Sequence, residues 1–136
     1  MDAILIDLEN RHGAAINILL LDVGVPIRWI VIRNLDDFAE ILKQKIIAIY
    51  CLPFIAEEKN QEVIDLIQEL TSKGAIFITP QESEYNSLAK YCTYVVKYPI
   101  SWNVKDDEGY INVDGTSAAC AFLTYKLYKQ INYKED

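Results

Sequence analysis

Short apolar runs alternate with longer segments along this chain, and the two kinds of segment predict two kinds of element. Short continuous apolar runs are typical of strands that are buried on both faces. They predict strands at Ala3–Ile6, Ile27–Ile32, Ile46–Cys51, Ala75–Thr79 and Thr93–Lys97. The longer segments carry apolar residues at helical spacing or in a mostly apolar stretch. They predict helices at His12–Leu21, Asp36–Lys45, Glu57–Lys73 and Ser117–Tyr133.

The remaining segments are less regular. Gln81–Tyr91 predicts a loop with a short helical turn around Leu88, and Pro99–Glu108 predicts a mostly polar loop. Tyr110–Val113 predicts a short strand. No internal repeat, low-complexity segment or linker interrupts the chain, so residues 1–136 are expected to form a single domain.

The alternation of strands and helices predicts the fold class. Buried strands joined by helices give right-handed crossovers, a mainly parallel sheet and helices on both of its faces. The expected architecture is therefore a three-layer α/β/α domain. In such sheets, functional residues lie beyond the carboxyl ends of the strands. That edge is expected to hold Asp7, Cys51–Pro53, Pro80–Ser83 and the helix starts at His12 and Ser117.

Composition and charge narrow the classes of function. Hydrophobic residues make up 51% of the chain, which suits a folded domain, and the formal net charge of −7 argues against a nucleic-acid partner. No apolar run is long enough to cross a membrane, and the first residues lack the basic start of a secretory signal. Three widely spaced cysteines and one histidine fit neither a disulfide framework nor a zinc site, and no motif implies a cofactor. A cytoplasmic location is expected.

The segment Asp114–Ala121 leads through Gly-Thr-Ser into the last predicted helix. It places Ser117 in the first helical turn, where free backbone N–H groups and the helix dipole stabilise a developing negative charge. A serine in such a position is a candidate nucleophile. The alternative is that Thr116 or Ser117 is only the N-cap of the helix, a role that both residue types fill well.

Three motifs together resemble the subtilisin-like serine proteases. Ile4–Asp7 is similar to the family's first core strand with its catalytic aspartate, and His12–Ile16 is similar to its HGTxVA helix entry. Asp114–Ala121 is similar to its GTSMAAP nucleophile motif, and the order Asp, His, Ser is the order of that family. The resemblance implies that Ser117 attacks a peptide carbonyl, that His12 transfers the proton and that Asp7 orients the imidazole.

The resemblance also implies a substrate site. Cys51, Leu52 and Pro53 correspond to the family's substrate-binding segment, and Gln81 or Ser83 would supply the oxyanion donor. The implied function is that of a serine endopeptidase. Its substrate would be a peptide or protein bound in extended form, and a partner subunit or a second copy would complete the cleft.

Two other functions stay open at the level of the sequence. Pro53 replaces a substrate-binding glycine, and the oxyanion asparagine has no clear counterpart. These departures favour a catalytically impaired pseudoenzyme that binds a peptide or protein, alone or as a subunit of a complex. A nucleotide-binding domain is less well supported, because Asp7-Leu8-Glu9-Asn10, and not a glycine-rich phosphate loop, follows the first strand.

Overall fold

The structure is a computed structural model that describes residues 1–8, 12–81, 85–106 and 109–133. Seven strands are present in these residues: β1 (Asp2–Leu8), β2 (Ile27–Ile32), β3 (Ala48–Cys51), β4 (Ile76–Pro80), β5 (Tyr94–Val96), β6 (Ile100–Asp106) and β7 (Gly109–Gly115). The helices are α1 (His12–Asp22), α2 (Leu35–Leu42), α3 (Gln61–Ser72), α4 (Thr116–Asn132) and the 3-10 turn η1 (Ala89–Tyr91).

The first five strands form one parallel sheet in the order β2-β1-β3-β4-β5. The first strand of the chain is thus an inner strand, with β2 on one side and β3 on the other. Its residues 3 to 7 are all buried, as the continuous apolar run predicts. β2 and β5 are the two edge strands of this sheet.

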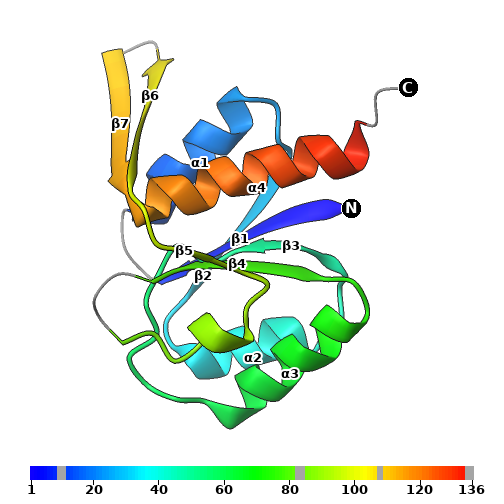
Figure 1. Ribbon diagram of the computed structural model, residues 1–136. Coiled ribbons are helices and arrows are strands. Elements are labelled where there is room, and N and C mark those ends of the chain that lie inside the picture. The colour runs from blue at the N-terminus through cyan, green and yellow to red at the C-terminus, as the bar shows by residue number, and fades with distance from the viewer. Residues whose placement is uncertain (9–11, 82–84, 107–108, 134–136) are drawn as a thin grey trace.

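Alternate residues of β1 point into two separate cores, one on each face of the sheet. Ile4 and Ile6 pack with α2 and α3, whereas Ala3 and Leu5 pack with α1 and α4. Figure 1 shows this arrangement, with the sheet seen nearly edge-on between the two helical layers. The predicted α/β/α class with a mainly parallel sheet is therefore confirmed.

Two helices are shorter than the sequence pattern predicts: α2 ends at Leu42 and not at Lys45, and α3 begins at Gln61 and not at Glu57. Asparagine side chains fix where both helices begin. Asn34 is the N-cap of α2 and its side chain accepts from the Asp37 N–H, whereas Asn60 is the N-cap of α3 and accepts from the Val63 N–H. The helix predicted from Glu57 therefore starts only at Gln61. These caps place both helix starts at the carboxyl edge of the sheet.

The polar loop predicted at Pro99–Glu108 is wrong. Ile100–Asp106 is strand β6, which pairs antiparallel with β7 and forms a hairpin beside α1 and α4 (Figure 1). The apolar residues Ile100, Trp102 and Val104 alternate with polar ones and belong to the core under α4. This period of two was visible in the sequence and identifies a strand with one buried face.

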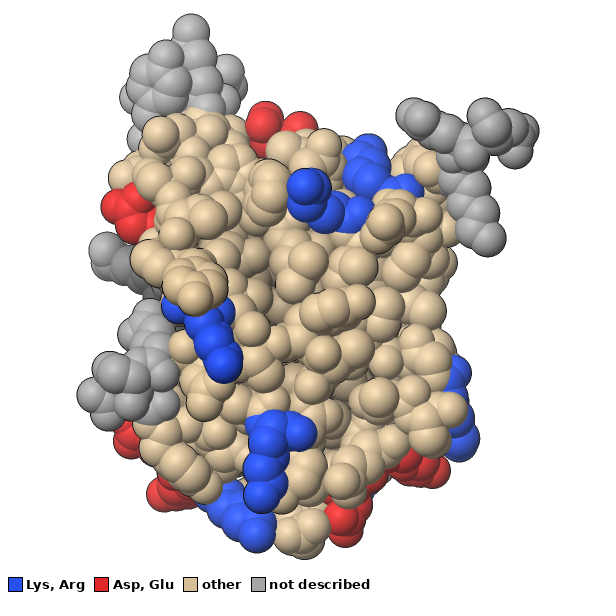
Figure 2. Space-filling view, viewed as in Figure 1, with Lys and Arg blue, Asp and Glu red and all other residues tan. Residues whose placement is uncertain are grey.

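Charge is unevenly spread over the surface. Figure 2 shows one face on which uncharged residues cover most of the middle, while acidic and basic side chains gather along the border where α2 and α3 lie. Several of these charges form ion pairs, among them those of Lys43 with Glu40 and of Lys45 with Glu69. In the part of the chain that the structure describes, no helix combines the length and apolar character that a membrane span requires.

Candidate functional site

The carboxyl edge of the sheet brings together several of the residues that the sequence singles out. Asp7 lies near the end of β1, with only 1% of its surface exposed, and its Oδ1 accepts a hydrogen bond from the Leu8 N–H at 2.8 Å. A buried carboxylate at the end of a parallel strand is an uncommon position for a charged group. Asp7 is therefore the first candidate functional residue at this edge.

The start of α1 lies directly against Asp7. A Cβ added at Gly13 would lie 3.0 Å from the Asp7 Cβ and 2.8 Å from the Trp29 Nε1, so only glycine fits there without movement of a neighbour. The sequence therefore places Asp7 and the His-Gly pair correctly as neighbours. His12 opens α1 as expected, and its side chain lies outside the described part of the structure.

Ser117 lies beside the segment that follows β3. Its hydroxyl donates to the Pro53 carbonyl oxygen at 3.3 Å, and the residue is in the first turn of α4, as predicted. The N-cap alternative is wrong for both Thr116 and Ser117, because Gly115 is the N-cap and no side chain caps the helix. Gly115 has φ of 99°, which explains why glycine stands there.

The two residues before Pro53 are buried. The Cys51 and Leu52 side chains have no exposed surface, and the Leu52 N–H donates to the Ile78 carbonyl at 2.8 Å. Burial raises the pKa of the Cys51 thiol to about 12; the Thr124 hydroxyl partly offsets this, and the nearby Asp7 carboxylate adds to it. The thiol is therefore neutral at physiological pH and belongs to the core under α4.

Of the two oxyanion candidates, Gln81 and Ser83, the structure describes only Gln81. Gln81 is exposed after β4, and its N–H donates to the Val96 carbonyl at 2.9 Å. It lines a pocket with Lys59, Tyr85 and Tyr91, residues that are not among the predicted site residues. Ser83 lies outside the described residues.

Sequence reasoning missed Asn86, which joins the loops after β3 and β4. Its Oδ1 accepts from the N–H groups of Ala56 and Leu88, and its Nδ2 donates to the Thr79 hydroxyl and the Pro80 carbonyl. The side chain is nearly buried, and its oxygen and both of its N–H donors are used. A single asparagine in an irregular stretch gives no sequence signal for such a role.

A pocket of about 420 Å³ opens at the same edge, on the side of α2 and α3. The end of β1, the β2–α2 connection and the segment after β3 form its walls. Its lining residues are Leu8, Arg33, Asn34, Leu35, Phe54, Ile55, Ala56, Glu57 and Glu58. Asp7 and Pro53 each directly precede a lining residue, so the pocket adjoins the candidates described above.

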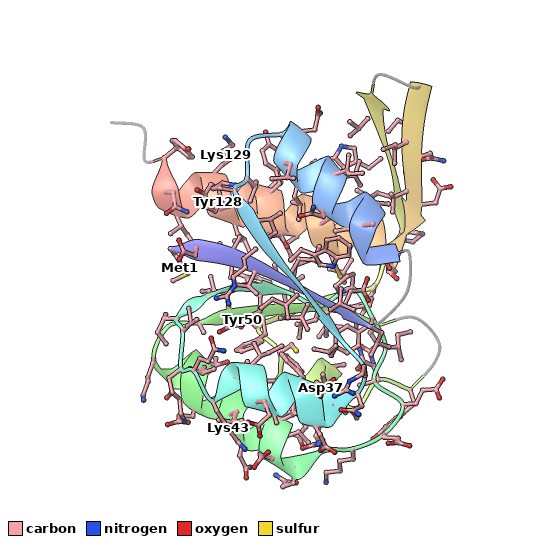
Figure 3. The ribbon with its side chains drawn as sticks, turned by 180° about the vertical axis from the view of Figure 1, so that it is seen from behind. Met1, Asp37, Lys43, Tyr50, Tyr128 and Lys129 are labelled. Carbon is pink, nitrogen blue, oxygen red and sulfur yellow. The ribbon has the colours of Figure 1, made fainter. Side chains whose placement is uncertain are left out.

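The rim of this pocket is held by hydrogen bonds and an ion pair. The Arg33 guanidinium donates to the Asp37 carboxylate at 3.0 and 3.2 Å, and these bonds lower the pKa of Asp37. Asp37, labelled in Figure 3, lies in the first turn of α2, while Asn60 Nδ2 donates to Asp36 at 3.0 Å and joins the starts of α2 and α3. These hydrogen bonds join the β2–α2 connection to α2 and the start of α2 to the start of α3.

No three histidine, cysteine or acidic side chains come together in the described ranges in a way that could hold a metal ion. The described part of the edge instead offers carboxylates, a guanidinium group, hydroxyl groups and apolar walls. This set of groups can bind a polar organic molecule by hydrogen bonds and van der Waals contact.

Comparison with known proteins gives one similar sequence. No family model matches the chain. An 82-residue part, 60% of the chain, is 30% identical to a carboxy-S-adenosyl-L-methionine synthase from Campylobacter lari. The chain spans about a third of that protein's length, since the match covers 34% of it.

Two solved structures are similar in fold. A 3-dehydroquinate dehydratase-like protein from Bifidobacterium longum has a TM-score of 0.53 at 9% identity, over 71% of this chain and 84% of that one. A putative pilus assembly protein (CpaE) from Burkholderia thailandensis has a TM-score of 0.45 at 14% identity, over 71% of this chain and 85% of that one.

The similar sequence is named as a carboxy-S-adenosyl-L-methionine synthase and not as a protease, and this finding overturns the resemblance to subtilisin-like proteases. The minimal subtilisin-like fold, the serine endopeptidase and the subtilisin-like pseudoenzyme are all corrected with it. The motifs have structural reasons of their own. Gly13 allows α1 to approach Asp7, Gly115 adopts a positive φ, and Ser117 bonds to a neighbouring carbonyl.

Proposed function

We propose that this chain is a small-molecule-binding α/β domain whose ligand is a nucleoside of the S-adenosyl-L-methionine type. The observation that carries the proposal is the position of the pocket lined by Leu8, Phe54 and Glu57. In the sheet order β2-β1-β3-β4-β5, β1 and β3 are neighbours. The strand that follows β1 in the chain lies on one side of this pair, and the strand that follows β3 lies on the other side. Open parallel sheets bind their ligands at such a point, beyond the carboxyl ends of the strands.

The chemistry of the pocket supports a ligand of this class. Leu8, Leu35 and Phe54 offer apolar surface for a base, and Glu57 and Glu58 offer exposed carboxylates. S-adenosyl-L-methionine carries a sulfonium and an ammonium group, which carboxylates attract, and ribose hydroxyl groups, which donate to them. The chain's net charge of −7 adds to the attraction for a cationic ligand.

The similar protein from Campylobacter lari supports the same class, since its name contains carboxy-S-adenosyl-L-methionine. The missing glycine-rich phosphate loop does not count against such a ligand, because this nucleoside carries no phosphate. We propose Pro53, which directly precedes the lining residue Phe54, as a residue that borders the bound ligand. Asp7 and Ser117 lie toward the α1 and α4 face of the sheet, on the other side from this pocket, and we propose that they support the end of β1 and the segment after β3.

Titration calorimetry of the purified chain with S-adenosyl-L-methionine tests the proposal. We expect saturable binding, and weaker binding of S-adenosyl-L-homocysteine, whose sulfur is neutral. The double variant Glu57→Gln/Glu58→Gln should weaken binding of the cationic ligand by roughly tenfold or more, because charged hydrogen bonds and ion attraction are lost. Glu69→Gln, on the last turn of α3, is the control and should leave binding unchanged. The absence of saturable binding up to about 1 mM would contradict the proposal.

The three free cysteines, Cys51, Cys92 and Cys120, support a further proposal, that the chain works in the cytoplasm. Free thiols persist in a reducing compartment. Fractionation of cells that express the chain tests this, and recovery from an extracytoplasmic fraction would contradict it.

A further inference from the structure

The edge strand β2 has no strand partner on its outer side among the described residues. Figure 3 looks onto this edge, where the light-blue strand crosses in front of β1 with no other ribbon segment before it. A free edge exposes a row of backbone N–H and C=O groups that can pair with another strand. Proteins usually protect such an edge by keeping the edge strand short, or by placing a lysine or an inward-pointing charged residue on it. β5, at the opposite edge, has only three residues, whereas β2 has six, and Arg28 is its one charged residue.

Large apolar side chains lie exposed along this edge. Trp29 and Val31 are 37% and 47% exposed, and both point to the face that α1 covers, because their partners Leu5 and Asp7 do so. α1 itself leaves Ile18 39% exposed and Leu21 51% exposed. The sequence predicts α1 as a largely buried helix, and its apolar residues continue onto this open side. Edge and helix together form one apolar strip.

We propose that β2 pairs antiparallel with β2 of a second copy of this chain, so that two five-stranded sheets join across a two-fold axis. A two-fold axis perpendicular to the sheet requires that residues directly opposite each other face the same side. The axis must therefore lie midway between two copies of the same residue, and we propose that this residue is Ile30. In this register Trp29 lies opposite the partner's Val31 twice, an aromatic and β-branched pairing that stabilises sheets.

Charge favours a second copy as the occupant. Each chain carries a net charge of −7, but β2 itself carries no acidic residue, so the two copies meet where neither is negative. Antiparallel pairing separates the two Arg28 positions by about four residues, roughly 13 Å, which exceeds the screening length at physiological salt. It also places each Arg28 toward the end of the partner strand, on the side where the first turn of α2 carries Asp36 and Asp37.

Sedimentation equilibrium of the full chain gives the first test. We expect a mass of about twice 15.6 kDa at micromolar concentration. Val31→Lys should raise the dimer dissociation constant by about tenfold or more, because it removes two apolar pairs and adds charge to the edge. Tyr94→Lys is the matched control, since it changes an exposed aromatic residue on the opposite edge strand and should leave the dimer intact. Circular dichroism confirms that each variant is folded.

A cysteine crosslink tests the register. Opposite residues of antiparallel strands have Cα atoms about 4.5–5.5 Å apart, within the range of a disulfide. Ile30→Cys should therefore form a disulfide-linked dimer under mild oxidation, whereas Val31→Cys and the wild type should crosslink much less. A monomeric wild type at about 100 μM, or a Tyr94→Lys variant that dissociates while Val31→Lys stays dimeric, would overturn the proposal. The result does not depend on nucleoside binding.

Discussion

At the scale of single residues, the most consequential side chain in this structure is one that the sequence pattern does not mark. Asn86 connects three segments: Ala56 after β3, Thr79 and Pro80 in β4, and Leu88 in its own loop. Because Ala56 also lines the proposed nucleoside pocket, this amide holds one wall of the pocket in place.

We expect Asn86→Ala to lower the free energy of unfolding by roughly 2–4 kcal/mol, because it leaves several buried donors and acceptors without partners. Urea denaturation measures this directly. Gln68→Ala, which removes an exposed amide on α3, is the control and should change stability little. A cost of Asn86→Ala no larger than that of the control would show that the loops are held by other contacts.

At this edge, the residue types in the sequence predict where the side chains lie better than they predict what those side chains do. The sequence places Asp7 beside the His-Gly pair and Ser117 in the first turn of α4, and the structure agrees. The inference from those positions to peptidase chemistry was wrong. A glycine required by close packing and a glycine required by a substrate look alike in one sequence, and only the contacts separate them.

At the scale of elements, the hairpin β6–β7 depends on the helix it packs against. A two-stranded hairpin alone is marginally stable in water. Trp102 packs edge-on against Phe122, with ring centroids 5.7 Å apart, and it also contacts Tyr125 at 6.3 Å. Val104 and Val113 are buried beneath it. α4 therefore supplies the apolar surface that the hairpin lacks.

Truncation of this anchor should loosen the hairpin locally. We expect Trp102→Ala to lower the free energy of local unfolding of the hairpin by about 2 kcal/mol. The hairpin amides should then exchange with deuterium faster, while those of β1 and β3 stay protected. Hydrogen exchange followed by mass spectrometry measures both regions in one experiment. Tyr98→Ala, which removes a mostly exposed ring just before β6, is the control. Equal exchange in the two variants would mean that Trp102 is not the anchor.

Elements were predictable where one physical signal dominates. The apolar runs of β1 and β3 and the amphipathic pattern of α3 identify their segments, because burial selects those residues. The apolar run of β2 also predicts its strand, although only Ile32 of that strand is buried. The start of α3 was misplaced, since it depends on a hydrogen bond from the Asn60 side chain. β6 was missed because Ser101, Asn103 and Lys105 make the segment look mostly polar, although its apolar residues alternate with them. The pairing of β6 with β7 depends on tertiary contact with α4.

At the scale of the whole molecule, each of the two cores on opposite faces of the sheet contains a buried side chain that can lose a proton in alkaline solution. Burial raises the pKa of Tyr50 to about 12, an effect that the Arg28 charge partly offsets, and burial likewise raises the pKa of Cys51 to about 12. The Tyr50 hydroxyl donates to the Ile46 carbonyl at 2.6 Å, and its ring stacks on Phe77. Both groups stay protonated in the folded chain well into alkaline solution.

Stability should therefore fall as the pH rises. The unfolded chain loses these protons near the ordinary pKa values of 9.0 for cysteine and 10.0 for tyrosine, while the folded chain keeps them until about 12. The folded state then binds more protons, so its stability is full below pH 9 and declines between pH 9 and 12. We expect a loss on the order of 4 kcal/mol between pH 8.5 and 11, about two thirds of it from Cys51, measured by urea unfolding. Cys51→Ala should reduce this slope, and an unchanged midpoint in the wild type would contradict the linkage.

Because the chain is synthesised from its N-terminal end, the two faces of the sheet are covered by helices at different times. Of the described elements, the inner strand β1 is synthesised first, and the helices that cover one of its faces, α2 and α3, are complete by Ser72. The other face holds Leu5, Ile49 and Ile78, and it waits for α4, which ends at Asn132. During synthesis α1 covers part of this face early, and the remainder stays open until α4 emerges, as in incomplete domains on the ribosome. Of the described elements, the last helix to emerge is thus the one that closes the core.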